Sequence, residues 1–202
     1  MYNMSMKDER LTEATIFYIK ALFEGSSDGH DLEHSLRVYK NALSIAASYP
    51  EADMDLISLS SLLHDVDDHK LFDTKNNANA RGFLEAHQVP QQKIDRICSV
   101  INSVSFSQNK GKAPDTLEGM VVQDADRLDA MGAIGVARTF AYGGEHGRSL
   151  GDSIQHFYDK LLRLKALMNT ETGRKMAERR HAFLEAFLEE YLEEEGRKRP
   201  LR

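Results

Sequence analysis

The sequence has little of several features that mark whole classes of proteins. It has a single cysteine, Cys98, so no disulfide can form within the chain, and a reducing compartment is favoured. It has no apolar run of about 18 residues, the length of a membrane-spanning helix. Residues 1–8 also lack the apolar core of a secretory signal. These absences predict a cytoplasmic protein with no membrane-spanning segment.

The charge of the chain excludes another class. The formal net charge is −6 at pH 7, and there is no clustered basic face of the kind that nucleic-acid-binding proteins use. A hydrophobic content of 41% is enough for a core. No internal repeat, low-complexity tract or linker interrupts the chain. We therefore expect a single domain over residues 1–202, with its core in about 26–140 and C-terminal helices in 152–194.

Apolar residues recur at intervals of three and four along nearly every long segment, and almost none alternate at two. This pattern predicts an all-α fold. The expected helices cover residues 8–23, 31–48, 54–66, 79–87, 90–106, 116–131, 152–168 and 171–194. Loops are expected at 109–115 and, because of its glycines, at 142–148. Gly132 and Gly135 are expected to be bends or close packing points.

The most informative feature is a set of ionisable residues in three groups. The first is His30-Asp31-Leu32-Glu33-His34, and Leu63-His64-Asp65-Val66-Asp67-Asp68 follows about thirty residues later. The third, Gln123 to Ala130, contains three aspartates. Each group lies on a predicted helix. Two imidazoles and two carboxylates brought to one point would suit a divalent metal that keeps positions open for water and substrate.

His34 is predicted to be buried. On a helix it shares a face with Val38, Asn41 and Ile45, opposite the face of Leu36. A helix that is apolar on two sides is central in its domain, and a buried imidazole needs a partner for each ring nitrogen. Taken alone, this pattern suits a satisfied core histidine as well as a metal ligand.

The His64-Asp65 doublet favours the metal. It ends an apolar helix and is followed directly by Asp67, Asp68 and His69. Ionisable side chains at this density are hard to explain as core packing, although a solvated helix end is an alternative.

Among the later aspartates, helix geometry separates Asp124 from Asp126. The two side chains point about 160° apart, so only one of them can enter a given site. Asp126 shares a face with Val122 and Asp129, where an unpaired carboxylate would be costly. We therefore choose Asp126 as the ligand, and Asp129 as a group that orients a ligand or a water.

The order His34, His64-Asp65, Asp126 resembles the HD superfamily of metal-dependent phosphohydrolases, whose ligands are a His, a His-Asp doublet and a distant Asp. Ala125-Asp126-Arg127-Leu128 is similar to the context of that last ligand, and the similarity covers most of residues 26–185. It is closest to small, single-domain bacterial members that resemble nucleotide pyrophosphohydrolases. The resemblance implies one divalent ion (Mn, Mg, Fe, Co or Ni), held by His34, His64, Asp65 and Asp126.

The resemblance also implies catalytic and substrate-binding groups around the ion. Asp67 and Asp68 are placed to activate or orient a water, and Asp68 is favoured. Cationic side chains would bind the phosphate charge. The candidates for that role are Lys70, Arg37, Arg138, His156 and Lys160. His30 is expected to support the ligands or to face the substrate.

The implied activity is hydrolysis of a small phosphorylated molecule. A nucleoside triphosphate losing pyrophosphate is the first expectation, and a nucleoside monophosphate is the second. The chain lacks the Gly-Tyr-Pro addition of cyclic-di-GMP phosphodiesterases. A non-catalytic metal- or nucleotide-binding sensor module is the alternative from a different class. A zincin-like peptidase fits less well, because Asp31 stands where its Glu should follow His30. The oligomeric state is left open.

Overall fold

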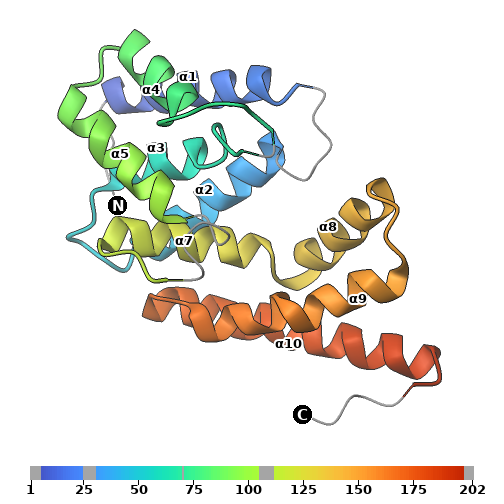
Figure 1. The fold of residues 1–202 in the computed structure, drawn as a ribbon. Helices are drawn as coiled ribbons and strands as arrows, with labels where there is room; N and C mark the ends of the chain where they lie inside the picture. The colour runs from blue at the N-terminus through green and yellow to red at the C-terminus, as the bar shows by residue number, and fades with distance from the viewer. Residues whose placement is uncertain (1–5, 25–30, 70, 105–111, 198–202) are drawn as a thin grey trace. The chain divides into compact units, whose positions relative to one another are not determined.

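The computed structural model describes residues 6–24, 31–69, 71–104 and 112–197, and within these ranges the chain forms helices and no strand. The prediction of an all-α fold is confirmed (Figure 1). The helices are α1 (Met6–Leu22), α2 (Leu32–Ala46), α3 (Met54–Leu63), α4 (Ala78–Ala86), α5 (Gln91–Val104), α7 (Leu117–Asp129), α8 (Gly132–Glu145), α9 (Leu150–Asp159), the 3₁₀ helix η1 (Leu161–Leu167) and α10 (Glu171–Glu194).

The chain is organised in two compact units, Met1–Asp126 and Arg127–Arg202, and the boundary between them falls inside α7. The expectation of a single domain remains a prediction. None of the described helices is both long enough and apolar enough to span a membrane.

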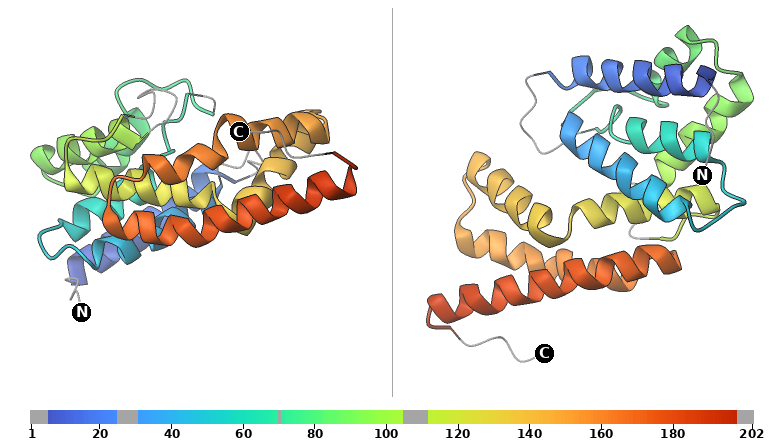
Figure 2. Two further views of the ribbon diagram at one scale, coloured as in Figure 1. Left: turned by 90° about the horizontal axis from the view of Figure 1, so that it is seen from below. Right: turned by 180° about the vertical axis from the view of Figure 1, so that it is seen from behind.

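In the first unit, α3 is the central helix. Every residue from Leu56 to Leu63 is buried, because α3 packs against α1, α2 and α5. Figure 2 shows α2 crossing beside α3. The face of α2 that contains Val38, Asn41 and Ile45 is buried, and His34 is buried on the same face, as its position on the helix predicted.

In the second unit, α10 packs against α8 and η1, and α9 packs against both α8 and η1. The rings of Phe140, Phe157 and Phe187 form its aromatic centre, with centroid separations of 5.6–6.0 Å. Gly132, the first residue of α8, has a φ of +69° where the chain turns from α7 into α8, so the bend expected there is confirmed.

The loop expected at 142–148 is wrong over its first four residues, because α8 continues to Glu145. The glycine at position 143 serves packing. A Cβ atom there would lie 2.5 Å from Oγ of Ser153, so a larger residue would force the Ser153 side chain of α9 to move. The contact between the helices offsets the cost of glycine in a helix, which is about 1 kcal/mol.

The prediction of one long helix over 152–168 is also wrong. α9 begins earlier, because Ser149 and Asp152 form a capping box, and it ends at Asp159. The chain then continues as η1. Leu161 and Leu164 are buried three residues apart, a spacing that suits the three residues per turn of a 3₁₀ helix. The other described helices lie within a few residues of the predicted ranges. The loop at 109–115 falls partly outside the described residues.

Candidate metal centre

His34 is positioned by the first turn of α2. Asp31 is the N-cap residue, and its Oδ1 accepts a hydrogen bond of 2.6 Å from the backbone N–H of His34. This bond satisfies one of the unpaired amides at a helix start. It also fixes the backbone of His34, whose side chain is only 2% exposed.

His64 and Asp65 follow the last residue of α3. The Nδ1 atom of His64 lies 2.8 Å from the carbonyl oxygen of Ser61. Because a carbonyl only accepts, Nδ1 carries the hydrogen and Nε2 is directed to the site. The side chain of Asp65 is 12% exposed, so both members of the doublet are largely removed from water.

Asp126 lies on α7. Hydrogen bonds to other parts of the first unit hold α7 in place just before this residue. The Nδ2 atom of Asn41 donates to the carbonyl oxygen of Ala125 at 3.3 Å. One turn earlier, Nε2 of Gln123 donates to the carbonyl oxygen of Ser103 at 3.0 Å. The Asp126 side chain is 31% exposed and is the most accessible of the four.

The four side chains converge. The Nε2 atoms of His34 and His64 are 3.2 Å apart, and Oδ2 of Asp65 lies 3.2 Å from each of them. Oδ1 of Asp126 lies 3.5 Å from Nε2 of His34 and 4.0 Å from Nε2 of His64. Neighbouring ligands of an ion with bonds of about 2.1 Å are separated by roughly 3–3.5 Å. The group of His34, His64 and Asp126 therefore fits a divalent ion, both in its donor types and in its spacing.

The charge distribution also favours a cation at this point. Burial acts to lower the pKa of His64, but Asp65, Asp126 and the Ser61 carbonyl outweigh it and raise the pKa to about 9. The two neighbouring carboxylates thus attract positive charge, which a proton or a metal ion can supply.

The structure separates the neighbouring aspartates by environment. Asp124 is fully buried, whereas the Asp126 side chain is 31% exposed. Both oxygens of Asp67 accept hydrogen bonds, from the backbone N–H groups of Asn79 and Ala80. The Asp68 side chain is 16% exposed, and its backbone N–H donates to the carbonyl oxygen of Asp65 at 3.0 Å.

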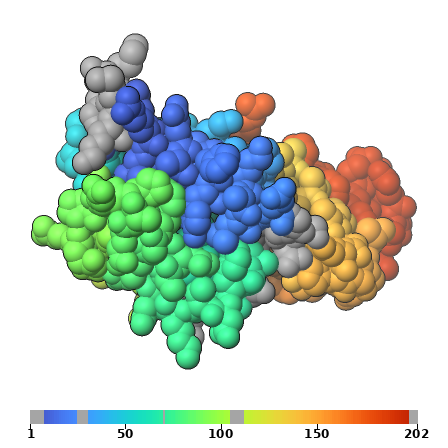
Figure 3. Space-filling model, turned by 90° about the horizontal axis from the view of Figure 1, so that it is seen from above, coloured from blue at the N-terminus to red at the C-terminus, as the bar shows by residue number. Residues whose placement is uncertain are grey.

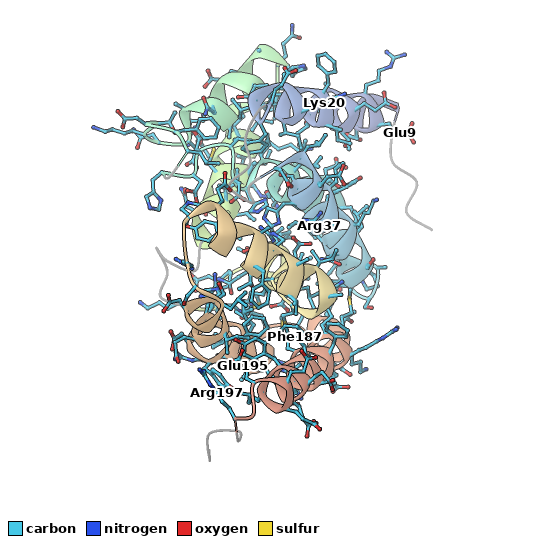
Figure 4. All side chains as sticks on the ribbon, turned by 90° about the vertical axis from the view of Figure 1, so that its right-hand side faces the viewer. Glu9, Lys20, Arg37, Phe187, Glu195 and Arg197 are labelled. Atoms are coloured by element: carbon cyan, nitrogen blue, oxygen red, sulfur yellow. The ribbon has the colours of Figure 1, made fainter. Side chains whose placement is uncertain are left out.

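The predicted cationic and supporting groups fall in three places. Arg37 follows His34 by one turn on α2 and is labelled in Figure 4. Lys70 and His30 lie outside the described residues. The others belong to the second unit, where Nη1 of Arg138 donates to Oδ2 of the buried Asp129 at 2.6 Å.

His156 and Lys160 lie at the end of α9. Burial lowers the pKa of His156, and the charges of Lys160 and Arg148 lower it further. Lys160 is the residue after the helix, with a φ of −133°, and its backbone N–H donates to the carbonyl oxygen of His156. The charge of Lys160 therefore acts on the His156 ring, although Lys160 itself is no longer part of the helix.

Two supporting groups were missed from the sequence. Asp31 gave a readable signal, an aspartate three residues before His34 at the start of an apolar helix. Asn79 gave none, because its contact with the doublet segment depends on tertiary structure.

Comparison with known proteins identifies the family of this chain. The family model described as HD domain matches residues 31–131. YpgQ of Bacillus subtilis is 38% identical over 191 residues, which cover 90% of this chain and 92% of YpgQ. The chain belongs to the HD family, and the resemblance predicted from its motifs is confirmed.

Solved structures give the same result. The crystal structure of Bacillus subtilis YpgQ in complex with ADP matches with a TM-score of 0.81 and 32% identity, over 94% of this chain and 97% of that one. An HD-superfamily hydrolase from Bacillus thuringiensis matches with a TM-score of 0.76 and 37% identity, over 96% of this chain and all (100%) of its own.

Proposed function

We propose that this protein is a metal-dependent phosphohydrolase of nucleotides. The observation that carries the proposal is the convergence of two imidazoles and two carboxylates within the first unit. Membership of a family with structural neighbours described as hydrolases supports hydrolysis as the reaction. We propose a nucleoside triphosphate as substrate, with nucleoside monophosphate and pyrophosphate as products, and a nucleoside monophosphate as the second candidate substrate.

We assign the metal ligands as His34, His64, Asp65 and Asp126. A bound divalent ion would lower the pKa of a coordinated water and neutralise charge on a phosphoryl oxygen. Asp68 is our candidate for accepting the proton of the attacking water. It is preferred to Asp67 because both Asp67 oxygens already accept backbone hydrogen bonds.

The candidate phosphate-binding groups remain those proposed from the sequence. Arg37 comes from the helix that carries His34. Arg138 is oriented by its ion pair with Asp129, and Lys160 lies beside His156. Since its pKa is lowered, His156 would act as a neutral hydrogen-bond donor. Lys70 completes the candidates.

The nucleotide class rests on a relative. The crystal structure of YpgQ contains ADP, and this chain matches YpgQ over nearly its whole length. This similarity supports a site that accepts an adenine nucleotide. The alternative is a sensor that binds the metal or the nucleotide without turning it over.

A product-resolved screen tests the proposal. Purified protein is incubated with nucleoside tri-, di- and monophosphates and Mn²⁺, Mg²⁺, Co²⁺ or Ni²⁺, and pyrophosphate and orthophosphate are measured separately. We expect pyrophosphate from triphosphates, and no product from an Asp65→Asn variant purified in the same way. In H₂¹⁸O, the label enters the nucleoside monophosphate if water attacks the α-phosphorus. Binding of ADP without any product, under every metal tested, would favour the sensor.

A further inference from the structure

Asp65 lies in a stretch of chain that no regular helix holds in place. α3 ends at Leu63, and the residues from His64 to Asp67 form turns before α4 begins at Ala78. Within the stretch, the backbone N–H of Asp68 donates to the carbonyl oxygen of Asp65. A ligand carried by turns needs support from outside the stretch if it is to keep its position.

That support comes from α4, through three hydrogen bonds. Nδ2 of Asn79 donates to the carbonyl oxygen of Val66 at 2.6 Å. In the opposite direction, Oδ1 of Asp67 accepts from the backbone N–H of Asn79 at 2.9 Å, and Oδ2 accepts from that of Ala80 at 3.0 Å. Asn79 and Asp67 thus connect α4 with both residues that follow Asp65.

These bonds also provide acceptors for the backbone N–H groups at the start of α4. The N-cap residue, Asn77, has a left-handed backbone with a φ of +56°, and its amide donates to Asn102. The carboxylate of Asp67 therefore acts as the cap of α4, from a position 12 residues before Asn79 in the chain. These hydrogen bonds pair polar groups of the turn segment and of α4 at the same time. Loss of the Asp67 or the Asn79 side chain would therefore affect both segments.

α4 is itself packed against α1. The ring of Phe83 stacks on Tyr18 of α1 with a centroid distance of 4.6 Å, and the hydroxyl of Tyr18 donates to the carbonyl oxygen of Asn79 at 3.3 Å. Figure 3 shows α1 beside the teal and green surface of this region. α4 is therefore a firm support to which the turn segment is attached.

We propose that Asn79 and Asp67 are positioning residues that hold the turn segment against α4 and thereby place the Asp65 carboxylate for the metal. This inference rests on the proposed metal site. Neither side chain is a metal ligand in this proposal. Asp67 positions the turn segment and does not accept the proton of the attacking water.

Mn²⁺ binding to the full chain, measured by isothermal titration calorimetry after chelator treatment, tests the inference. Asn79→Ala should raise the Kd for Mn²⁺ by about 10-fold or more, the effect expected when a support of a metal ligand is lost. Asp67→Asn, which retains one acceptor oxygen, is a milder second variant if Asn79→Ala does not fold. In activity assays, either change should raise the Mn²⁺ concentration for half-maximal rate more than it lowers the rate at saturating Mn²⁺.

Arg81→Ala is the matched control. It removes the bonds of α4 to Asp95 and to the Asn76 carbonyl and leaves Asn79 and Asp67 in place. Thermal unfolding of each variant is recorded beside the titrations. We expect the Kd of Arg81→Ala to stay within about twofold of wild type. Wild-type affinity in Asn79→Ala and Asp67→Asn, or an equal loss in Arg81→Ala, would overturn the inference while leaving the metal site intact. Failure of the wild-type chain to bind Mn²⁺ would instead overturn the proposed function, and the inference with it.

Discussion

Asp126 contributes one anionic oxygen to the cluster, and an amide of the same size cannot replace it. Asp126→Asn should therefore lower the affinity for Mn²⁺ by a factor of about 10–100 or more. Asp124→Asn is the control on the same helix, because Asp124 and Asp126 point about 160° apart on α7. It should retain metal and most activity. A titration in which Asp124→Asn is damaging and Asp126→Asn is silent would show that the ligand assignment is wrong.

The doublet gives a second residue-level prediction. His64→Ala or Asp65→Ala should remove bound metal and activity while the helices stay formed, because the two side chains serve the cluster more than the packing of α3. Metal content and far-UV circular dichroism measure the two effects. His69→Ala is a suitable control, since its side chain is 60% exposed. Full metal content in either doublet variant would contradict the assignment.

His156 provides a prediction about protonation. Burial, together with Lys160 and Arg148, lowers its pKa, so its imidazole should titrate below the ordinary value of about 6.5 in an NMR pH series. It is then neutral at pH 7. Lys160→Gln removes one of the neighbouring charges and should raise the pKa of His156. A His156 midpoint above 6.5 in the wild-type chain would contradict this description.

Single residues differ in how far sequence could place them. The burial of His34 followed from its position on the helix, and the choice of Asp126 followed from the register of α7 together with a familiar motif. The capping of α4 by Asp67 could not be predicted, since it joins segments whose separation depends on how the chain turns between them. The pairing of Arg138 with Asp129 was also missed. Arg138 was predicted to bind phosphate, and Asp129 was predicted to orient a ligand or a water.

At the scale of elements, apolar periodicity located the helices well, because a helix such as α5 buries one stripe of apolar side chains, whereas α3 is buried on all sides. Apolar periodicity gave the wrong element where the same residue type occurs in two kinds of structure. Gly143 was interpreted as part of a loop, yet it lies inside α8 where Ser153 of α9 approaches. The split of 152–168 into α9 and η1 was also missed, since leucines spaced three apart suit both helix types.

Gly135 in α8 yields the prediction at this scale. A Cβ atom there would lie 2.3 Å from the carbonyl oxygen of Ala130, and backbone atoms cannot move aside easily. Gly135→Ala should therefore destabilise the protein by about 1–3 kcal/mol in denaturant unfolding. Gly144→Ala in the same helix is the control, because an added Cβ there meets nothing within 4 Å. It should be neutral or slightly stabilising. Equal stability of the two variants would contradict the steric argument.

For the whole molecule, the sequence predicted the fold class and the family but not the division at residue 126. Its four ligand candidates come from α2, the end of α3 and α7, which are far apart in the chain. Helix faces and a motif were enough to select them. Their separations, by contrast, depend on how α2 and α3 cross and on the anchoring of α7 by Asn41 and Gln123, and periodicity contains no such information.

Metal binding should be visible in the stability of the molecule. An ion that binds the folded chain only, at 100 times its Kd, stabilises it by about 2.7 kcal/mol. Thermal unfolding of the 202-residue chain with Mn²⁺ should therefore shift upward by roughly 5–10 °C. A chelator should reverse the shift, and Asp65→Ala should show none. An identical shift in that variant would mean that Mn²⁺ acts elsewhere.

The hydrogen bonds between Asp67 and α4 have a consequence for how this part of the sequence can change in evolution. The doublet and the two positioning residues, Asp67 and Asn79, lie in one stretch of chain between His64 and Ala80. A duplication, recombination or graft that moves this stretch would carry the two candidate ligands together with these positioning residues. Residues elsewhere in the chain can then diverge with less effect on this half of the site, whereas changes within the stretch need to occur in matched pairs.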